Sequence, residues 1–441
     1  MTDVKLFKSI LKILIITIIF SFINIKTINS LDRESKIQNN VYIGSVNVSN
    51  LTKQEAMQKM KDELEVYDEL KLTYKNKIYK LRISNMGVNY EIEKMVDEAF
   101  DVGKNEKLTK RIEKLLKLKH KTNVSIAIQY KIDEQYLQQY IRKLNEKINT
   151  KPIDANIYMK DNQIHIEKES YGIEVDDEKL YQYIKEKVEN IYIEKIEIPI
   201  KLIEPQYLYD ELNKINCILG RYETKFNPNS LNRVSNIKNA VEVTSNKIIK
   251  PNEEFSFNYF TGKGDLRSKL KSAPIIINGK LEEGIGGGIC QVSSTLYNAV
   301  LYSGLQVTSI KNHSIPSGYI EKGRDATIST GVIDFKFKNN LENYIFIHSE
   351  IKNDKVVSTI YGNEKDKKDI EVVTELVETI ENKVEIVKTD KLYIGQVEVS
   401  QKGRIGYKVN TYRINKISNE KEFIFQSYYP PMNEIIMVGI K

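Results

Sequence analysis

The chain contains few of the side chains that most often perform chemistry, with 2 cysteines and 4 histidines among 441 residues. Cys217 and Cys290 are too few for a disulfide framework, and a chain of this length does not need one to fold. A single bridge between them stays open as an alternative to two free thiols, with Cys217 as a small buried side chain. No group of cysteines and histidines has metal-ligand spacing, so the sequence predicts neither a metal nor another cofactor.

The sequence also lacks a concentrated basic region. Its net charge is +7, but lysines alternate with acidic residues over most of the length, and this argues against a nucleic-acid partner. Nucleotide-binding loops are missing too, because no G-K-[ST] follows the glycines at 286–288 and Ile289 occupies the third glycine position of a dinucleotide fingerprint. A modest positive excess does suit attraction to an anionic cell wall or membrane.

Only one long apolar run is found, at Ile13–Ile25, and Lys5, Lys8 and Lys12 precede it. A positive flank followed by a short apolar block is typical of a secretory signal or a signal anchor within residues 1–30. An uncleaved single-pass anchor is the favoured interpretation, with a cleaved signal and a buried helix as alternatives. Either of the first two places the rest of the chain outside the cytoplasm, in the cell envelope.

The pattern of the remaining chain predicts a multidomain α+β protein. Residues 41–204 alternate short strands with amphipathic helices, which indicates two α+β repeat units. A mixed α+β domain follows at 215–362, with its core at 215–345, and an all-β module at 368–441. We expect a hairpin turning at residues 160–162. We expect helices at 53–67 capped by Thr52, near 91–102, near 108–118, at 133–149 capped by Asp133, and at 176–191.

Residues 284–305, GIGGGICQVSSTLYNAVLYSGL, carry the clearest chemical signal. Three consecutive glycines allow positive φ angles and close approach, and a helix is expected to begin near Val292 and to end at Gly304. Cys290 then lies at or just before the helix N-terminus, where unpaired amides and the helix dipole lower a thiol pKa. The backbone amides of Gly287, Gly288 and Gln291 are candidates to bind the oxyanion of a tetrahedral intermediate.

A nucleophilic thiol needs a base, and His313 is the best placed of the four histidines. It lies in a loop 23 positions after Cys290, whereas His120 falls in a lysine-rich helix and His165 and His348 fall in strands. Asp325 is expected to orient His313 as the third member of a triad.

Three further residues are candidates for contact with the substrate. Arg324 is expected to bind a substrate carboxylate, and Ser293 and Ser314, beside Cys290 and His313 in sequence, are expected to line the site. The alternatives stay open that Cys290 is a buried packing residue, that His313 is structural, and that Arg324 and Asp325 form a surface ion pair.

Five separate blocks in this region together resemble the VanW domain, over about residues 215–345. They are EEFSFN (253–258), APIIINGK (273–280), GGGICQVSSTLYNAV (286–300), NHS (312–314) and GRDATIS (323–329). YIGSVNVSNLTKQEA and ESYGIEVDDEKL are similar to a tandem peptidoglycan-binding domain, and the tail with IGQVEVSQKGRIGYKV is similar to a G-five domain, a β module that binds wall glycans. The stretch GKGDLRSKL departs from the VanW pattern, so a substrate-contact loop differs here.

The resemblance implies partners and a reaction. VanW proteins are linked by name to glycopeptide resistance, and some members are understood as L,D-transpeptidases. Cys290 would attack the carbonyl after the third residue of a tetrapeptide stem, expel D-Ala and pass the acyl group to a neighbouring stem, giving a 3→3 cross-link. The implied partners are peptidoglycan stem peptides and glycan strands, with the membrane contacted through the N-terminal segment. A thiol peptidase acting on stems and a non-catalytic wall-binding protein are the alternatives.

Overall fold

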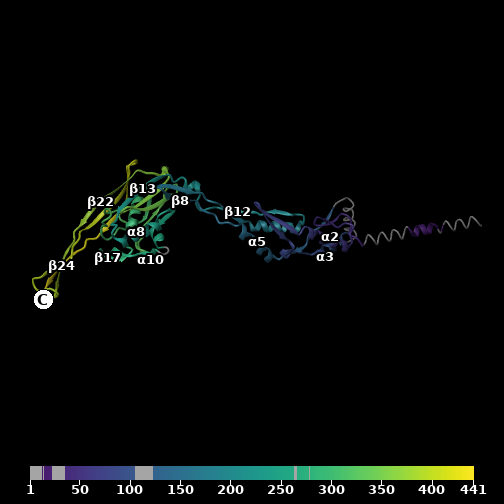
Figure 1. The fold of residues 1–441 in the computed structure, drawn as a ribbon, viewed down its shortest axis with the longest axis horizontal. Coiled ribbons are helices and arrows are strands. Elements are labelled where there is room, and N and C mark those ends of the chain that lie inside the picture. Colours follow the sequence, from purple (N-terminus) through teal and green to yellow (C-terminus); the bar gives the residue numbers. More distant parts are fainter. Residues whose placement is uncertain (1–11, 13, 22–34, 105–122, 263–265, 278) are drawn as a thin grey trace, which may run out of the picture. The chain divides into compact units, whose positions relative to one another are not determined.

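The computed structural model describes residues 12, 14–21, 35–104, 123–262, 266–277 and 279–441 (Figure 1). They form two compact units, one with residues up to Pro152 and Tyr171–Glu204, the other with Ile153–Ser170 and Pro205–Lys441. The multidomain α+β class is confirmed. No described helix is long and apolar enough to cross a membrane. Most of the expected anchor segment, and the helix expected near 108–118, lie outside the described residues.

The first unit contains four of the expected helices: α2 (Lys53–Val66), α3 (Ile92–Asp101), α5 (Glu134–Ile148) and α6 (Asp177–Glu189). Thr52 caps α2 in a capping box with Glu55, and the Asp133 carboxylate accepts the first amides of α5, as their sequences predict. The strands are short: β1 (Val41–Ile43), β2 (Val46–Asn47), β3 (Glu69–Tyr74), β4 (Lys77–Arg82), β5 (Asn89–Tyr90), β6 (Val124–Ile126), β7 (Tyr130–Lys131), β10 (Gly172–Val175), β11 (Lys195–Glu197) and β12 (Ile200–Ile203).

The two cores of this unit do not follow one another along the chain. The hairpin β3–β4 contributes Leu70 and Leu81 to the core that holds α5 and α6, rather than to the core of α2 and α3. β11 pairs in parallel with β3, from more than a hundred residues further along the chain. The two α+β halves therefore exchange a hairpin, which no local pattern in the sequence indicates.

The second unit begins with an inserted hairpin, β8 (Asn156–Lys160) and β9 (Gln163–Glu167). Its turn lies where the sequence predicts, with Asp161 and Asn162 at φ 52° and 60°. The sequence predicts this hairpin within the repeat units of residues 41–204, whereas its packing lies in the second unit. Ile157 is buried in a cluster with Leu212 and Phe346 of the second unit.

The main sheet of the second unit has the order β13 (Cys217–Lys225), β21 (Lys355–Gly362), β20 (Ile345–Lys352) and β14 (Lys247–Ile249). Helix α11 (Ile289–Tyr302) packs on β13 and β21, and α8 (Leu231–Thr244) packs on β20 and α11. The smaller elements are α7 (Tyr209–Leu212), β15 (Glu254–Ser256), α9 (Phe257–Thr261), α10 (Leu266–Lys269), β16 (Ser272–Ile277), β17 (Lys280–Ile285), β18 (Gln306–Ser309) and β19 (Lys336–Lys338).

The C-terminal module is all-β, as its alternating pattern predicts. One sheet contains β22 (Ile370–Ile380), β25 (Gly406–Asn415) and β26 (Glu420–Tyr429), and the other contains β23 (Val384–Thr389), β27 (Glu434–Gly439) and β24 (Val397–Gln401). Val372 and Ile424 of the first sheet pack against the core that contains α11. This sheet therefore shares apolar packing with the mixed α+β domain.

Candidate active site

Cys290 is the second residue of α11. The helix begins at Ile289, three positions earlier than expected, because Gly288 at φ 111° turns the chain directly into it. Every residue from Ile289 to Leu301 is buried except Cys290, which is half-buried. Both cysteines are free thiols. The thiol thus lies at the positive end of a 14-residue helix and keeps access to solvent.

The glycine turn before Cys290 is tightly fixed. A Cβ on Gly287 would lie 2.6 Å from the Pro274 carbonyl oxygen, so this position has no room for a side chain. The Asn236 amide donates to the Gly287 carbonyl at 3.0 Å. Within the described part of the chain, the backbone amides of Gly287, Gly288 and Cys290 have no acceptor. These three N–H groups are the ones available to a developing oxyanion.

The expected oxyanion role of Gln291 is revised. Its backbone amide donates to the Gly288 carbonyl at 3.0 Å, so this N–H already has an acceptor. Its side-chain amide donates to Thr224 Oγ1 at 3.1 Å and to the Lys225 carbonyl at 2.8 Å, and this attaches the start of α11 to β13. Gln291 therefore anchors the helix, and the Cys290 amide takes its place among the candidate donors.

His313 and Asp325 lie together beside the thiol. Asp325 Oδ2 accepts from the His313 backbone amide at 2.7 Å and lies 2.6 Å from His313 Nδ1. Because Nδ1 faces Asp325, Nε2 is the ring nitrogen left for Cys290, and the imidazole lowers the pKa of that thiol. The Cys290 thiol itself donates to the Ile328 carbonyl at 3.7 Å. The side chains of His313 and Asp325 are nearly sealed from solvent, being 8% and 1% exposed. The fold thus brings the three predicted catalytic residues together.

The contacts set the charge state of the pair. Burial opposes ionisation of the thiol, but the hydrogen bond and charge of His313 outweigh it and lower the pKa of Cys290. Burial likewise opposes the charged imidazole, but the bonds to Asp325 and Cys290 outweigh it and raise the pKa of His313 to about 10. Both shifts favour the ion pair of a thiolate and an imidazolium over the neutral pair.

Several polar groups surround Cys290, and most of them give no signal in the sequence. The Cys290 carbonyl accepts from Ser294 Oγ at 2.7 Å and from the Tyr319 hydroxyl at 3.2 Å. Burial and the charge of Cys290 raise the pKa of Tyr319, so its hydroxyl stays protonated. Ser317 Oγ lies 3.3 Å from His313 Nδ1. Only Ser294, one helical turn after Cys290, is placed by a recognisable spacing.

Arg324 faces groups of the protein itself. Its Nε donates to Asn298 Oδ1 at 2.7 Å, and its guanidinium lies 4.8 Å from the ring centre of Tyr222 and 5.4 Å from that of Tyr302. It is 6% exposed and has no bond to Asp325, so the alternative of a surface ion pair is wrong. The binding of a substrate carboxylate by Arg324 stays a prediction.

The two serines expected at the substrate differ in accessibility. Ser293 is fully buried and its hydroxyl donates to the Ala326 carbonyl at 2.6 Å. Ser293 is therefore not accessible to a substrate, contrary to expectation. Its hydroxyl instead joins α11 to the loop that carries Asp325. Ser314 is half-buried in the loop next to His313, and its role stays a prediction.

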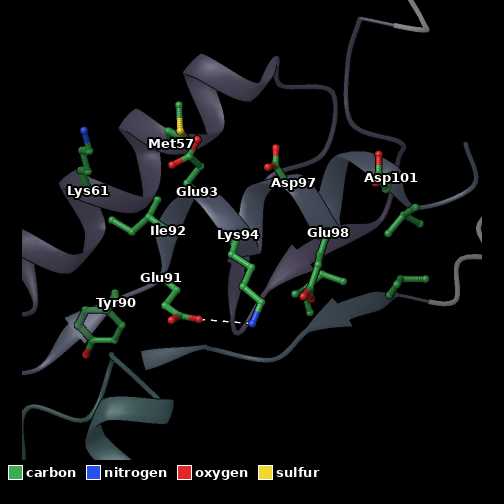
Figure 2. A pocket seen from close by; sticks show the side chains of 13 residues that line it. Met57, Lys61, Tyr90, Glu91, Ile92, Glu93, Lys94, Asp97, Glu98 and Asp101 are labelled. Atoms are coloured by element: carbon green, nitrogen blue, oxygen red, sulfur yellow. Dashed lines mark hydrogen bonds and ion pairs between the residues drawn. The ribbon is translucent and has the colours of Figure 1, made fainter. Parts of the chain in front are cut away.

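An open cleft of about 1030 Å³ in the first unit has a different character (Figure 2). It lies along α3, and its lining has several carboxylates but no cysteine, histidine or serine. Glu91 is paired with Lys94 and Lys131, and Asp97 with Lys53. The cleft therefore lacks the thiol and the imidazole that the candidate site around Cys290 combines.

Comparison with known proteins matches three families along the chain. Residues 232–361 match the VanW like protein family, residues 79–193 a peptidoglycan binding domain, and residues 371–441 the G5 domain. The G5 domain structure of an IgA1 protease is 27% identical, with a TM-score of 0.14, and covers 17% of this chain and 94% of that one.

Two relatives have sequence similarity to part of the chain. The vancomycin B-type resistance protein VanW of Enterococcus faecalis (strain ATCC 700802 / V583) is 30% identical over 160 residues, 35% of this chain and 58% of that protein. The uncharacterized protein YoaR of Bacillus subtilis (strain 168) is 35% identical over 236 residues, 53% of this chain and 76% of that protein. The chain therefore belongs to the VanW-like family, as a cell-wall-associated member that also carries a peptidoglycan binding domain and a G5 domain.

Proposed function

We propose that this protein is an L,D-transpeptidase that forms 3→3 cross-links between peptidoglycan stem peptides through a cysteine acyl-enzyme. The observation that carries the proposal is the buried His313–Asp325 pair, which lowers the pKa of Cys290 at the start of α11 through the imidazole. The peptidoglycan binding domain supplies the class of substrate. In this proposal the N-terminal segment attaches the protein to the outer face of the cytoplasmic membrane.

The first half-reaction would make a thioester. The Cys290 thiolate attacks the carbonyl carbon between the diaminopimelate residue and the terminal D-Ala of a donor stem, and a C–S bond forms. The carbonyl oxygen becomes an oxyanion that the amides of Gly287, Gly288 and Cys290 receive. The imidazolium of His313 gives its proton to the departing nitrogen, the C–N bond breaks, and D-Ala leaves.

The second half-reaction would transfer the acyl group. The side-chain amine of a neighbouring stem attacks the thioester carbonyl while neutral His313 accepts its proton. The new amide forms, the C–S bond breaks, and the thiolate beside the imidazolium is restored. Asp325 stabilises the charged ring in both halves and fixes Nε2 toward the sulfur. The net reaction joins two stems and releases one D-Ala, with no external energy source.

The test uses the full chain and purified disaccharide-tetrapeptide, with products followed by mass. We expect a dimer that lacks one D-Ala, and its loss in Cys290→Ala. The matched control is Cys217→Ala, because Cys217 lies half-buried on β13 and has no contact with His313. Stems shortened without dimers would indicate a thiol peptidase. Wall binding without any product would indicate a non-catalytic protein and would refute the proposal.

A further inference from the structure

A tyrosine of the C-terminal β module reaches the catalytic carboxylate. Tyr429, the last residue of β26, donates its hydroxyl to Asp325 Oδ1 at 2.5 Å. The same hydroxyl accepts the Gly323 backbone amide at 2.8 Å. The side chain is 1% exposed, and burial together with the charge of Asp325 raises its pKa, so the phenol remains a donor. Asp325 is thus bound by His313 on one oxygen and by Tyr429 on the other.

This contact belongs to a continuous set of bonds between the module and the two loops of the triad. Thr411 Oγ1 on β25 donates to the Gly323 carbonyl at 2.7 Å. The Asn312 side chain, next to His313, donates to the Tyr428 carbonyl at 2.9 Å and accepts the Tyr428 amide at 3.3 Å. The module therefore holds the chain on the His313 side and on the Asp325 side of the pair.

Close approach of the module depends on Gly323. This residue has φ 88°, and a Cβ placed on it would lie 2.8 Å from Thr411 Oγ1 and 3.0 Å from a methyl of Val409. A glycine allows both the positive φ and the short separation. Arg413 of β25 also donates to the Leu305 carbonyl at 2.7 Å, just after α11. The interface is built from specific hydrogen bonds to buried backbone groups.

We propose that Tyr429 is a positioning residue of the catalytic centre, and that the sheet β22–β25–β26 is a structural part of this centre. The inference rests on the proposed function and deepens it. A buried carboxylate with two donors on Oδ2 and none on Oδ1 is left partly unpaired and less fixed in rotation. The Tyr429 hydroxyl supplies the missing donor and holds the carboxylate in the plane that His313 needs. A wall-binding module attached only by a linker would not supply such a group.

The test compares Tyr429→Phe with Tyr428→Phe in the full chain. Tyr428 is the matched control because its ring is 49% exposed and it meets Asn312 through backbone atoms. We expect Tyr429→Phe to lower the rate of dimer formation about 10-fold, the loss that follows from removing one hydrogen bond to a charged group. The midpoint of the pH profile for Cys290 alkylation is expected to move upward, toward that of an ordinary thiol. Tyr428→Phe is expected to match the unchanged protein in both measurements.

The pH profile of Cys290 alkylation separates the positioning role of Tyr429 from the proposed transpeptidase reaction, because alkylation needs no turnover. An unchanged or lowered midpoint in folded Tyr429→Phe would overturn the positioning role, even where dimers form. A raised midpoint in a protein that makes no Cys290-dependent product would support the positioning role and refute the proposed reaction. If Tyr429→Phe does not fold, Thr411→Val removes the neighbouring bond to Gly323. We expect it to slow dimer formation about 5-fold and to raise the same midpoint, and a midpoint equal to that of the unchanged protein would overturn the inference.

Discussion

Replacing Asp325 by asparagine tests the electrostatic basis of the site most directly. The substitution keeps the size of the side chain and removes its charge from a group that is 2% exposed. The amide oxygen is still able to face His313, while its NH₂ group faces the Tyr429 hydroxyl. The change thus removes the anion beside the imidazole with little loss of packing.

The expected loss is large because the pair is buried and close. The distance from Asp325 Oδ2 to His313 Nδ1 is 2.6 Å, and removing one partner of a buried ion pair costs about 3–5 kcal/mol. A tenfold change in rate corresponds to about 1.36 kcal/mol, so dimer formation should fall about 10²- to 10⁴-fold. The bond to Asp325 is the largest influence that raises the pKa of His313. Without it this pKa falls toward its ordinary value, and the alkaline limit of activity moves downward.

The assay is the rate of dimer formation against pH, with urea unfolding to verify the fold. Asp334→Asn is the matched control, because this carboxylate caps α9 through the Asn258 amide at 2.9 Å and has no contact with His313. We expect it to keep the rate and the pH profile of the unchanged protein. A folded Asp325→Asn protein with a rate within twofold of the unchanged protein would refute the triad.

Three further outcomes are expected. The alkylation of Cys290, followed by mass against pH, should have its midpoint at a lower pH than that of Cys217. The reason is that His313 lowers the pKa of Cys290, whereas burial raises that of Cys217. A common midpoint would contradict this. Gly287→Ala should destabilise the protein by about 1–3 kcal/mol in urea unfolding and slow Cys290 alkylation, because the new Cβ meets two carbonyl oxygens. The control Gly318→Ala has open space around it and should change neither measurement. Arg324→Lys should lower the free energy of unfolding by about 2–3 kcal/mol, because lysine cannot reproduce the guanidinium bonds and ring contacts, and a loss under 0.5 kcal/mol would contradict their importance.

Local patterns in the sequence identify most of the helices and the position of Cys290 at the start of one of them. Thr52 and Asp133 cap the helices that the sequence assigns to them, because capping depends on backbone amides only two or three positions away. The glycines before Cys290 indicate a turn into a helix for the same reason. The start of α11 is missed by three residues, because Gly288 takes a positive φ that leads directly into helical geometry.

Contacts between distant segments are what the sequence does not reveal. The β3–β4 hairpin joins the opposite core, and the β8–β9 hairpin joins the second unit, because apolar alternation defines a buried face without defining its partner. Tyr429 lies 104 positions after Asp325, and a tyrosine at the end of an alternating strand has no feature that marks it. The sequence predicts the oxyanion donors incompletely for a related reason. Whether the Gln291 backbone amide is free depends on the first turn of the helix, where it donates to the Gly288 carbonyl.

Helix α11 holds Cys290 and Asp325, which come from separate segments, near the same histidine. Besides its apolar core residues the helix carries buried polar side chains, and two of these bind the loop on both sides of Asp325. Asn298 donates to the Arg324 carbonyl at 2.8 Å, and Ser294 Oγ accepts the Ala326 amide at 2.9 Å. The residues before and after the carboxylate are thus attached to the helix that carries Cys290. Because buried polar groups are costly when unpaired, any shift of the loop breaks several bonds at once, and this fixes the distance across the site.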